Sequence, residues 1–372
     1  MKYYIIAGEA SGDLHGSNLI KEIKLLDPGA QIRAWGGDLM ASQGATLVKH
    51  INELAFMGFV EVAMNLPTIL GNIKRCKNDI LEFAPDAIIF IDYPGFNLRI
   101  AEFARKKGFR TVYYISPQIW AWHQSRVKKI IRDIDKMLVI LPFEKDFYQQ
   151  YNYSVDFVGH PLLDALQGQK EEDNTETFRR EHDLGIKPIV ALLPGSRRQE
   201  IARMLAPMAR MAQHFPEHEF VIAATSAHTL AYYKQFIPNQ NIRIVFGQTY
   251  RLLRHATAAM VTSGTATLET ALIGTPQVVC YKAGTLSYLI ARKLVNLKYI
   301  SLVNLIMDQQ VVKELIQGQL NEATLKNELK QLLENSDYRN EMTQNYATLR
   351  GKLGGSGASQ KAARAIVDFT NS

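Results

Sequence analysis

The chain has 372 residues and a mass of 42.0 kDa, which is enough for two domains of ordinary size. Hydrophobic residues make up 47% and charged residues 21%, a globular composition that excludes disordered and fibrous classes. The formal net charge of +7 favours an anionic partner (phosphates, nucleic acid or an anionic membrane surface), and the two cysteines, Cys76 and Cys280, are too few for a disulfide scaffold or a cysteine-rich zinc site.

The first half of the chain alternates short apolar runs with longer amphipathic segments. We expect strands at residues 3–7, 32–35, 87–91, 111–115, 137–141 and 157–158, and helices at 13–26, 67–83 and 98–107. The N-terminal apolar run is short and acidic residues follow it at once, so it indicates a strand and not a signal peptide. No stretch is long and apolar enough to predict a membrane-spanning helix. Apolar strands separated by helices predict a parallel sheet with both faces covered.

A polar connection at residues 167–177 precedes a second half, in which the alternation starts again. Here we expect strands at residues 189–193, 220–224, 242–246, 258–261 and 277–281, and only helices from about residue 322 onward. The pattern therefore predicts two doubly wound α/β domains, residues 1–165 and 166–340, and C-terminal helices at 341–372. Because such sheets bind ligands at the carboxyl ends of their strands, the loops that follow strands are the candidate sites.

The loop after the first strand, GEASGDLHG at residues 8–16, has the glycines of a tight strand-to-helix turn. Its spacing fits neither a dinucleotide-binding fingerprint nor a P-loop. A plain structural interpretation is that Ser11 or Asp13 caps the helix. A functional role is favoured by Glu9, which stands at the carboxyl end of a strand.

The sequence IDYPGFN at residues 91–97 places Asp92 directly after an apolar strand. A carboxylate at that edge is partly desolvated and can act as a general base. The alternative is that Asp92 only caps the turn at Pro94.

Aromatic and basic residues follow the next strand. Trp120 and Trp122 are two positions apart, so that one could lie in the core and the other line a pocket. The basic stretch that begins at Arg126 could bind an anion or form a solvated helix face. His160 follows the last expected strand of the first half, and it could be an interdomain crevice residue or a structural histidine.

Two loops of the second half have the composition of phosphate sites. In LPGSRRQE, residues 193–200, the backbone amides of Gly195 and Ser196, the guanidinium of Arg197 and a helix N-terminus predict a diphosphate site. The loop at residues 262–269 adds a second anion cradle, in which Glu269 could accept hydrogen bonds from ribose hydroxyls; its other candidates are Ser263, Gly264, Thr265 and Thr267. Two such loops in one half predict a nucleoside diphosphate donor.

Metal ligands are not indicated. The pair Asp133 and Asp135 lies among basic residues, so we expect metal-independent chemistry in which Arg197 and helix dipoles stabilise a leaving diphosphate. The apolar segment at residues 56–70, which includes Met57 and Phe59, is by default a core helix. It is also the best candidate for an acyl-chain groove or a membrane contact, since basic residues follow it.

Taken together, these stretches resemble the lipid-A-disaccharide synthase family of bacterial glycosyltransferases, which have the GT-B fold. The resemblance spans most of the chain in the expected order: GEASGDLHG (8–16), LAFMGFVEV (54–62), IDYPGFN (91–97), YYISPQIWAW (113–122), LPFEKDFY (141–148), FVGHPLLD (157–164), LLPGSRRQEI (192–201), SGTATLE (263–269) and YISLVNLI (299–306).

The resemblance implies a reaction. UDP-2,3-diacylglucosamine donates its sugar, with inversion and without a cofactor, to 2,3-diacylglucosamine 1-phosphate (lipid X). The products are the lipid A disaccharide 1-phosphate and UDP. The resemblance makes Asp92 the preferred base and leaves Glu9 and His15 as alternatives. It assigns Arg197, the loop at 262–269 and Asn304 to the donor. The residues expected on the acceptor and lipid side are Gly12, Asp13, Met57, Phe59, Trp120, Trp122 and Arg126.

The chain departs from the family pattern at two positions. Gly95 stands where relatives often have a second aspartate, which concentrates the case for a base on Asp92, and His123 stands where they often have arginine. The family also implies a peripheral protein on the cytoplasmic face of the inner membrane, and a homodimer is compatible with the helical C-terminus. Two other functions fit parts of the pattern: a UDP-sugar epimerase of the same fold, and a non-catalytic protein that binds UDP-sugars or anionic lipids. The basic residues are scattered, so a nucleic-acid partner is not expected.

Overall fold

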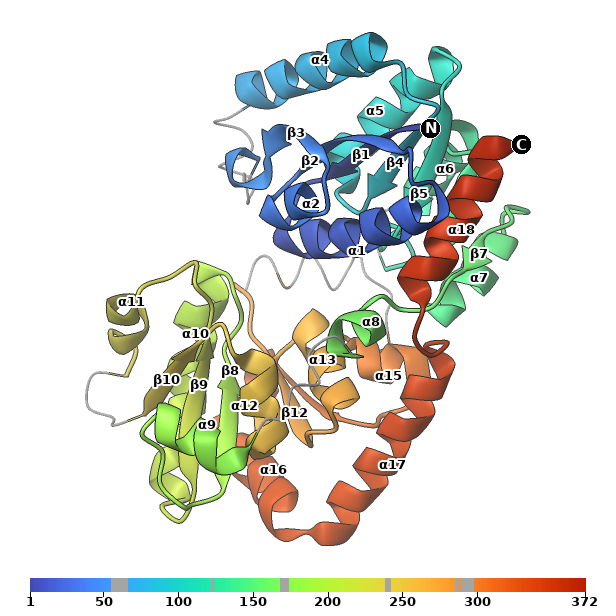
Figure 1. Ribbon diagram of the computed structural model, residues 1–372. Coiled ribbons are helices and arrows are strands. Elements are labelled where there is room, and N and C mark those ends of the chain that lie inside the picture. The colour runs from blue at the N-terminus through green and yellow to red at the C-terminus, as the bar shows by residue number, and fades with distance from the viewer. Residues whose placement is uncertain (55–65, 122–123, 168–173, 238–241, 285–287, 289–297) are drawn as a thin grey trace. The chain divides into compact units, whose positions relative to one another are not determined.

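The computed structural model describes residues 1–54, 66–121, 124–167, 174–237, 242–284, 288 and 298–372 (Figure 1). The chain divides into two compact units. The first comprises Met1–Asp164 together with Leu353–Ser372, and the second comprises Ala165–Lys352. Among the described helices, none has the length and apolar character needed to cross a membrane.

The first unit is built on a seven-stranded sheet in which every pair of neighbouring strands is parallel. The strand order is β3-β2-β1-β4-β5-β6-β7. The strands are β1 (Lys2–Ala7), β2 (Gln31–Gly36), β3 (Thr46–His50), β4 (Ala87–Ile91), β5 (Arg110–Tyr114), β6 (Lys136–Val139) and β7 (Asp156–Phe157). The helices are α1 (Ala10–Leu26), α2 (Asp38–Ser42), α4 (Leu66–Phe83), α5 (Pro94–Lys106), α6 (Val127–Asp133), α7 (Pro142–Gln149), α8 (Leu162–Gln167), which runs into the second unit, and α18 (Ala358–Asn371).

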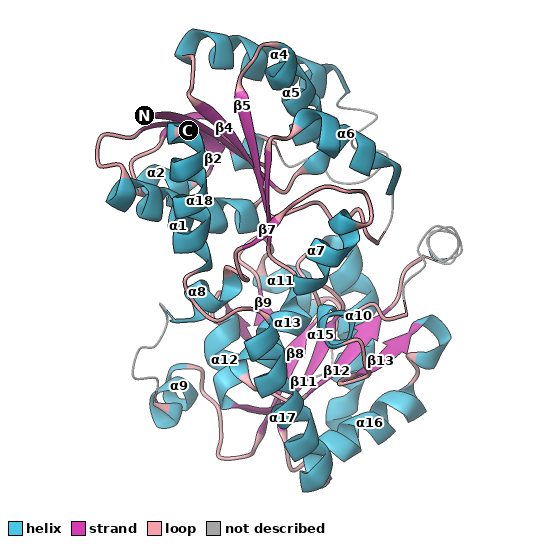
Figure 2. Cartoon of the chain, turned by 90° about the vertical axis from the view of Figure 1, so that its right-hand side faces the viewer, coloured by secondary structure: helices cyan, strands magenta, loops and turns pink. Residues whose placement is uncertain are grey.

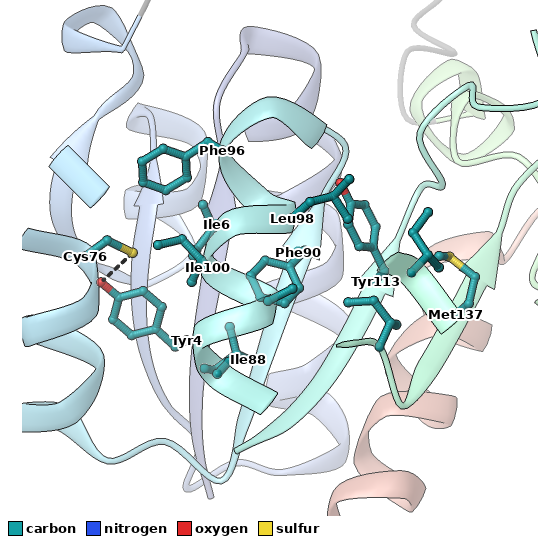
Figure 3. Packing of buried hydrophobic residues seen from close by; sticks show 14 of the residues in the cluster. Tyr4, Ile6, Cys76, Ile88, Phe90, Phe96, Leu98, Ile100, Tyr113 and Met137 are labelled. Atoms are coloured by element: carbon teal, nitrogen blue, oxygen red, sulfur yellow. Dashed lines mark hydrogen bonds between the residues drawn. The ribbon is translucent and has the colours of Figure 1, made fainter. Parts of the chain in front are cut away.

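Helices cover both faces of this sheet. On one face, α4, α5 and α6 pack against apolar side chains of the strands, among them Tyr4, Phe90 and Tyr113 (Figure 3). Tyr4 also accepts a hydrogen bond from the indole of Trp35 and approaches the thiol of Cys76. On the other face, α1 lies against α18, which also contacts β5.

The second unit repeats the plan with a six-stranded parallel sheet of order β10-β9-β8-β11-β12-β13. Its strands are β8 (Ile189–Leu193), β9 (Glu219–Ala224), β10 (Arg243–Phe246), β11 (Ala256–Thr262), β12 (Gln277–Tyr281) and β13 (Lys313–Ile316). Figure 2 shows α9 and α12 on one side of the strands and α10 and α16 on the other. The helices are α9 (Thr175–Glu181), α10 (Arg198–Arg210), α11 (Leu230–Lys234), α12 (Thr249–His255), α13 (Thr265–Ile273), α15 (Leu302–Met307), α16 (Glu322–Glu334) and α17 (Ser336–Lys352).

The predicted fold class is confirmed, with several differences in detail. All eleven expected strands are present, but β3 and β13 were not predicted. Both are edge strands with charged residues and little continuous apolar sequence. Helix α5 starts at Pro94, four residues earlier than expected, because proline is well suited to a first helical turn. The polar connection contains the start of α9.

The C-terminal helices divide between the units. Helix α17 contacts α13, α15 and α16, so the second unit extends to Lys352 and not only to residue 340. Helix α18 belongs to the first unit and is held at both ends by side chains of opposite charge. Asp164 accepts hydrogen bonds from the amides of Gly357 and Ser359 at the N-terminus, and Arg110 donates to backbone carbonyls of the last turn. These charges complement the helix dipole.

Candidate active site

The strand order of the first unit reverses between β1 and β4, and both predicted acidic residues follow these two strands. Ala7 is paired with Ile91 in the parallel ladder, so Glu9 and Asp92 leave the sheet at neighbouring positions. Such a switch point is where doubly wound sheets bind ligands. The structure therefore brings Glu9 and Asp92 to one place.

Asp92 has an unusual backbone. It and Tyr93 both adopt left-handed conformations, with φ of 43° and 51°. Non-glycine residues rarely do so, and each costs about 1–3 kcal/mol where the surroundings enforce it. Two donors converge on the Asp92 carbonyl: the Tyr113 hydroxyl at 2.6 Å and the Asn97 Nδ2 at 2.7 Å.

The side chain of Asp92 is electrostatically tuned. Burial and, second to it, the negative charge of Glu9 raise the pKa of its carboxyl to about 6, against a lowering hydrogen bond from the Tyr93 backbone. A carboxylate with a pKa near neutrality is suited to accept a proton from a hydroxyl group.

Glycine is required at position 8 by the ring of Tyr93. A Cβ on Gly8 would lie 2.3 Å from Cγ of Tyr93, because the ring packs directly over the loop. The ring also stacks on Phe96, at 5.6 Å between centroids. Desolvation, with a smaller contribution from Glu9, raises the pKa of the Tyr93 hydroxyl. The loop after β1 and the turn after β4 thus form one packed surface.

Asp13 does not cap its own helix. Helix α1 begins after Glu9 without a side-chain cap, and the expectation that Ser11 or Asp13 would cap it was wrong. The buried Asp13 carboxylate instead accepts hydrogen bonds from the amides of Gly37 (2.7 Å), Leu39 (3.1 Å) and Met40 (3.1 Å) at the start of α2. Its neighbour Gly12 packs against Ala7, and a Cβ at position 12 would lie 3.0 Å from the Cβ of Ala7.

His15 lies close to His160. Burial lowers the pKa of His15 to about 4 and that of His160 to about 3, so both rings are neutral near pH 7. The charge of His15 contributes to lowering the pKa of His160, and the negative charge of Asp164 raises the pKa of His15 against the effect of burial. The Nδ1 atom of His160 accepts a hydrogen bond from the amide of Leu162, which supports the structural interpretation of His160.

The structure describes only some of the aromatic and apolar candidates. Trp120 is 9% exposed and packs edge-on against Phe143, at 4.8 Å between centroids. Trp122, Met57 and Phe59 lie outside the described residues, as does most of the segment 56–70. Arg126 precedes α6. Burial raises the pKa of Tyr113, and the positive charge of Arg126 acts against this rise.

The D-x-D pair has structural partners. Asp133 forms an ion pair with Arg132 at 2.7 Å, and Asp135 accepts hydrogen bonds from the amide and hydroxyl of Thr111. Within the described ranges, no group of three or more His, Cys, Asp or Glu side chains is arranged to hold a metal ion.

One buried acid was not predicted. Glu144 is 1% exposed and accepts hydrogen bonds from the amides of Ile140 and Leu141. Burial raises the pKa of its carboxyl to about 8. The sequence signal was available in LPFE, where proline begins a helix and a glutamate follows at the position of a capping box.

In the second unit, the two predicted phosphate loops follow β8 and β11, between which this strand order also reverses. In the first loop Gly195 is left-handed, with φ of 99°. The amides of Ser196 and Arg197 both donate to the Glu200 carboxylate at 3.2 Å, so a phosphate would have to replace that carboxylate. The Arg197 side chain is 62% exposed, and its Nη1 lies 3.8 Å from the same Glu200 carboxylate.

The second loop is more open. Gly264 and Thr265 are exposed at the start of α13, and no side chain of the described residues caps this helix. Its first-turn amides can therefore face an anion. Thr267 is fully buried and donates back to the Gly264 carbonyl at 2.8 Å. Burial raises the pKa of Glu269, which is hydrogen-bonded to Tyr250.

Asn304 is fully occupied by contacts within its unit. Its amide group accepts from the backbone of Val311 and Val312 and donates to Val312 and Glu314, at 2.8 to 3.0 Å. Glu314, which was not predicted, also accepts from the amides of Ile300 (3.0 Å) and Ser301 (2.9 Å). The Ile300 carbonyl in turn accepts from Ser263 at 3.2 Å. The pair Asn304–Glu314 is thus linked through Ile300 to the loop at residues 262–269.

Comparison with known proteins gives consistent results. The family model described as lipid-A-disaccharide synthetase matches residues 3–367. The lipid-A-disaccharide synthase of Syntrophus aciditrophicus is 41% identical over 367 residues, covering 96% of this chain and 95% of the relative. That of Trichlorobacter lovleyi is 37% identical over 374 residues, covering 98% and 96%.

Solved structures with a similar fold are more distant in sequence. A UDP-GlcNAc 2-epimerase from Neisseria meningitidis bound to UDP-GlcNAc has a TM-score of 0.70 at 13% identity, covering 99% of this chain and 100% of that one. The glycotransferase of kitacinnamycin has a TM-score of 0.66 at 13% identity, covering 99% and 98%. At this identity the likeness concerns the fold alone.

Proposed function

The chain belongs to the lipid-A-disaccharide synthase family, and on that premise we propose which residues of its two units take part in the reaction. It is a glycosyltransferase that forms the lipid A disaccharide from a UDP-sugar donor and a lipid acceptor. The epimerase alternative is not favoured, because the epimerases share the fold at 13% identity, whereas the synthases share 35–41% of the sequence. A non-catalytic binding protein would not need a carboxyl tuned like that of Asp92.

We assign UDP-2,3-diacylglucosamine as donor and 2,3-diacylglucosamine 1-phosphate as acceptor. Asp92 removes the proton from the acceptor 6-hydroxyl as that oxygen attacks the anomeric carbon of the donor. The bond from this carbon to the UDP oxygen breaks, and the configuration inverts. The observation that carries the assignment is the partly buried carboxyl at the switch point, with its pKa raised to about 6.

The leaving UDP gains negative charge, which must be stabilised by groups fixed in advance. We assign this task to the Arg197 guanidinium and to the uncapped N-terminus of α13 at Gly264 and Thr265. Their exposure and their position after β8 and β11 support it. Asn304 acts on the donor only indirectly, through the backbone that it and Glu314 hold.

We further propose peripheral association with the cytoplasmic face of the inner membrane, and a homodimer. Support for the membrane contact comes from the net charge of +7 and from α4, where Leu70 and Leu81 are 53% and 48% exposed. Lys74, Arg75 and Lys77 lie on the same helix and suit anionic headgroups.

The test is UDP release in detergent with both lipid substrates, with and without EDTA, and mass spectrometry of the product. We expect disaccharide 1-phosphate under both conditions. Asp92→Asn should lower turnover about 10²–10⁴-fold, with unchanged UDP affinity by calorimetry. The matched control is Asp38→Asn, whose side chain is 96% exposed. Normal turnover of Asp92→Asn would refute the assignment of the base, and UDP binding without product would refute the assigned acceptor.

A further inference from the structure

We infer that Tyr113 and Asn97 are positioning residues for Asp92: they hold its backbone carbonyl and so fix where its carboxylate stands. This inference rests on the proposed role of Asp92 as the base.

The turn after β4 needs support of this kind. Asp92 and Tyr93 are consecutive non-glycine residues in the left-handed region, and a free chain would leave that region. Relaxation of φ at Asp92 would swing its side chain away from the strand end. A contact that prevents relaxation therefore acts on the position of the carboxylate without touching it.

Two fully buried side chains supply that contact from different elements. Tyr113 on β5 donates its hydroxyl to the Asp92 carbonyl at 2.6 Å, and Asn97 on α5 donates Nδ2 to the same oxygen at 2.7 Å. Nδ2 of Asn97 also lies 3.4 Å from the carbonyls of Ile6 and Ile91. The amide group thus ties the end of β1, which leads to Glu9, to the end of β4, which leads to Asp92.

The chain contains a matched comparison for the hydroxyl. Tyr114 is the next residue of β5 and is also fully buried, and its hydroxyl lies near Ser359 of α18. Phenylalanine would fill either site equally well. Only at position 113 does the hydroxyl reach the turn that carries Asp92.

The decisive experiment compares Tyr113→Phe with Tyr114→Phe in the full-length enzyme. We expect Tyr113→Phe to lower kcat at least tenfold, with the donor KM within twofold of wild type. The acidic limb of the pH–rate profile should move to lower pH, because a released carboxylate is better hydrated. The ionisable groups that face this region are Glu9 from the loop after β1, Tyr93 from the turn itself, Tyr148 from α7, and Arg126, whose charge reaches Tyr113. Tyr114→Phe should keep both kcat and the pH profile.

A double variant separates positioning from general damage. If Tyr113 acts through Asp92, adding Tyr113→Phe to Asp92→Asn should cause no further loss of residual turnover. Asn97→Ala, which removes the second donor, should reproduce the split between kcat and KM. Thermal unfolding of each variant shows that it is folded.

Three results would overturn the inference: wild-type kcat in Tyr113→Phe, an equal loss in Tyr114→Phe, or a further proportional loss in the double variant. Failure of the proposed function looks different, because Asp92→Asn would then itself keep full turnover. If Asp92→Asn abolishes activity and Tyr113→Phe does not, Asp92 remains the base and only the positioning role of Tyr113 is refuted.

Discussion

Replacement of Asp13 by alanine should destabilise the first unit strongly. The carboxylate accepts hydrogen bonds from three backbone amides at the start of α2, and the bonds from Gly37 and Met40 are buried. A buried donor left without an acceptor costs about 1–3 kcal/mol, so the two together cost about 2–6 kcal/mol. The third hydrogen bond, from the amide of Leu39, is only partly buried and adds less. Asp13→Asn keeps one acceptor oxygen and should fall between alanine and wild type.

Tryptophan fluorescence during urea unfolding is a selective assay for this change. Trp35 and Trp120 are buried in the first unit, and the sequence of the second unit, residues 165–352, contains no tryptophan. The unfolding midpoint therefore reports on the first unit alone. Trp35 lies two residues before Gly37 and is close to the altered contact.

The control is Asp38→Ala, in the same first turn of α2, where the side chain is 96% exposed. It should change stability by no more than about 0.5 kcal/mol. If Asp13→Ala unfolded at the wild-type urea concentration and only raised the acceptor KM, the hydrogen-bonding argument would be refuted. Asp13 would then be a ligand-binding residue, as the family resemblance suggested.

Three further changes have defined outcomes. Turnover should fall about tenfold per pH unit below about 6, because the base must be unprotonated. Glu9→Gln removes the neighbouring charge that raises the pKa of Asp92, so the fall in initial rate should begin at a lower pH than in the wild type. Gly8→Ala should displace the Tyr93 ring and cost about 1–3 kcal/mol, measured by urea unfolding. Glu314→Gln should weaken UDP binding severalfold in calorimetry, since a hydrogen bond to a charged group contributes about 1.5–3 kcal/mol to holding the donor loop.

Two of these changes have a matched control. Gly95→Ala, where a Cβ would meet nothing within 4 Å, should leave stability unchanged. Glu334→Gln, at a side chain 60% exposed, should leave UDP affinity unchanged. A pH limb that stays in place in Glu9→Gln would show that Glu9 does not act on the base.

The central strands and the strand-end loops were predictable because their signals are local. A strand buried on both faces is apolar throughout, and the residue that follows it is near the ligand edge wherever the strand lies in the sheet. Glu9 and Asp92 were found in this way. The edge strands β3 and β13 give no such signal, because one side of an edge strand is unpaired and tolerates charged residues such as Lys49 and Lys313.

Roles that depend on partners distant in sequence could not be read from the motifs. Asp13 has the local pattern of a helix cap, but its amide partners lie 24 to 27 residues further on. Asn304 matches a donor-site asparagine of the family, yet the chain around Glu314 occupies its amide. Asp164 and Gly357 are 193 residues apart, and only the folded unit brings them together.

The docking of α18 reverses the order in which the units can be finished during translation. Some 190 residues are synthesised between Asp164 and Leu353, which takes about 10–40 s at about 5–20 residues per second. For that interval the faces of α1 and β5 that α18 covers have no partner from their own chain. The second unit is continuous and can close as soon as Lys352 has emerged from the ribosome. The unit that begins the chain is therefore the last to be completed.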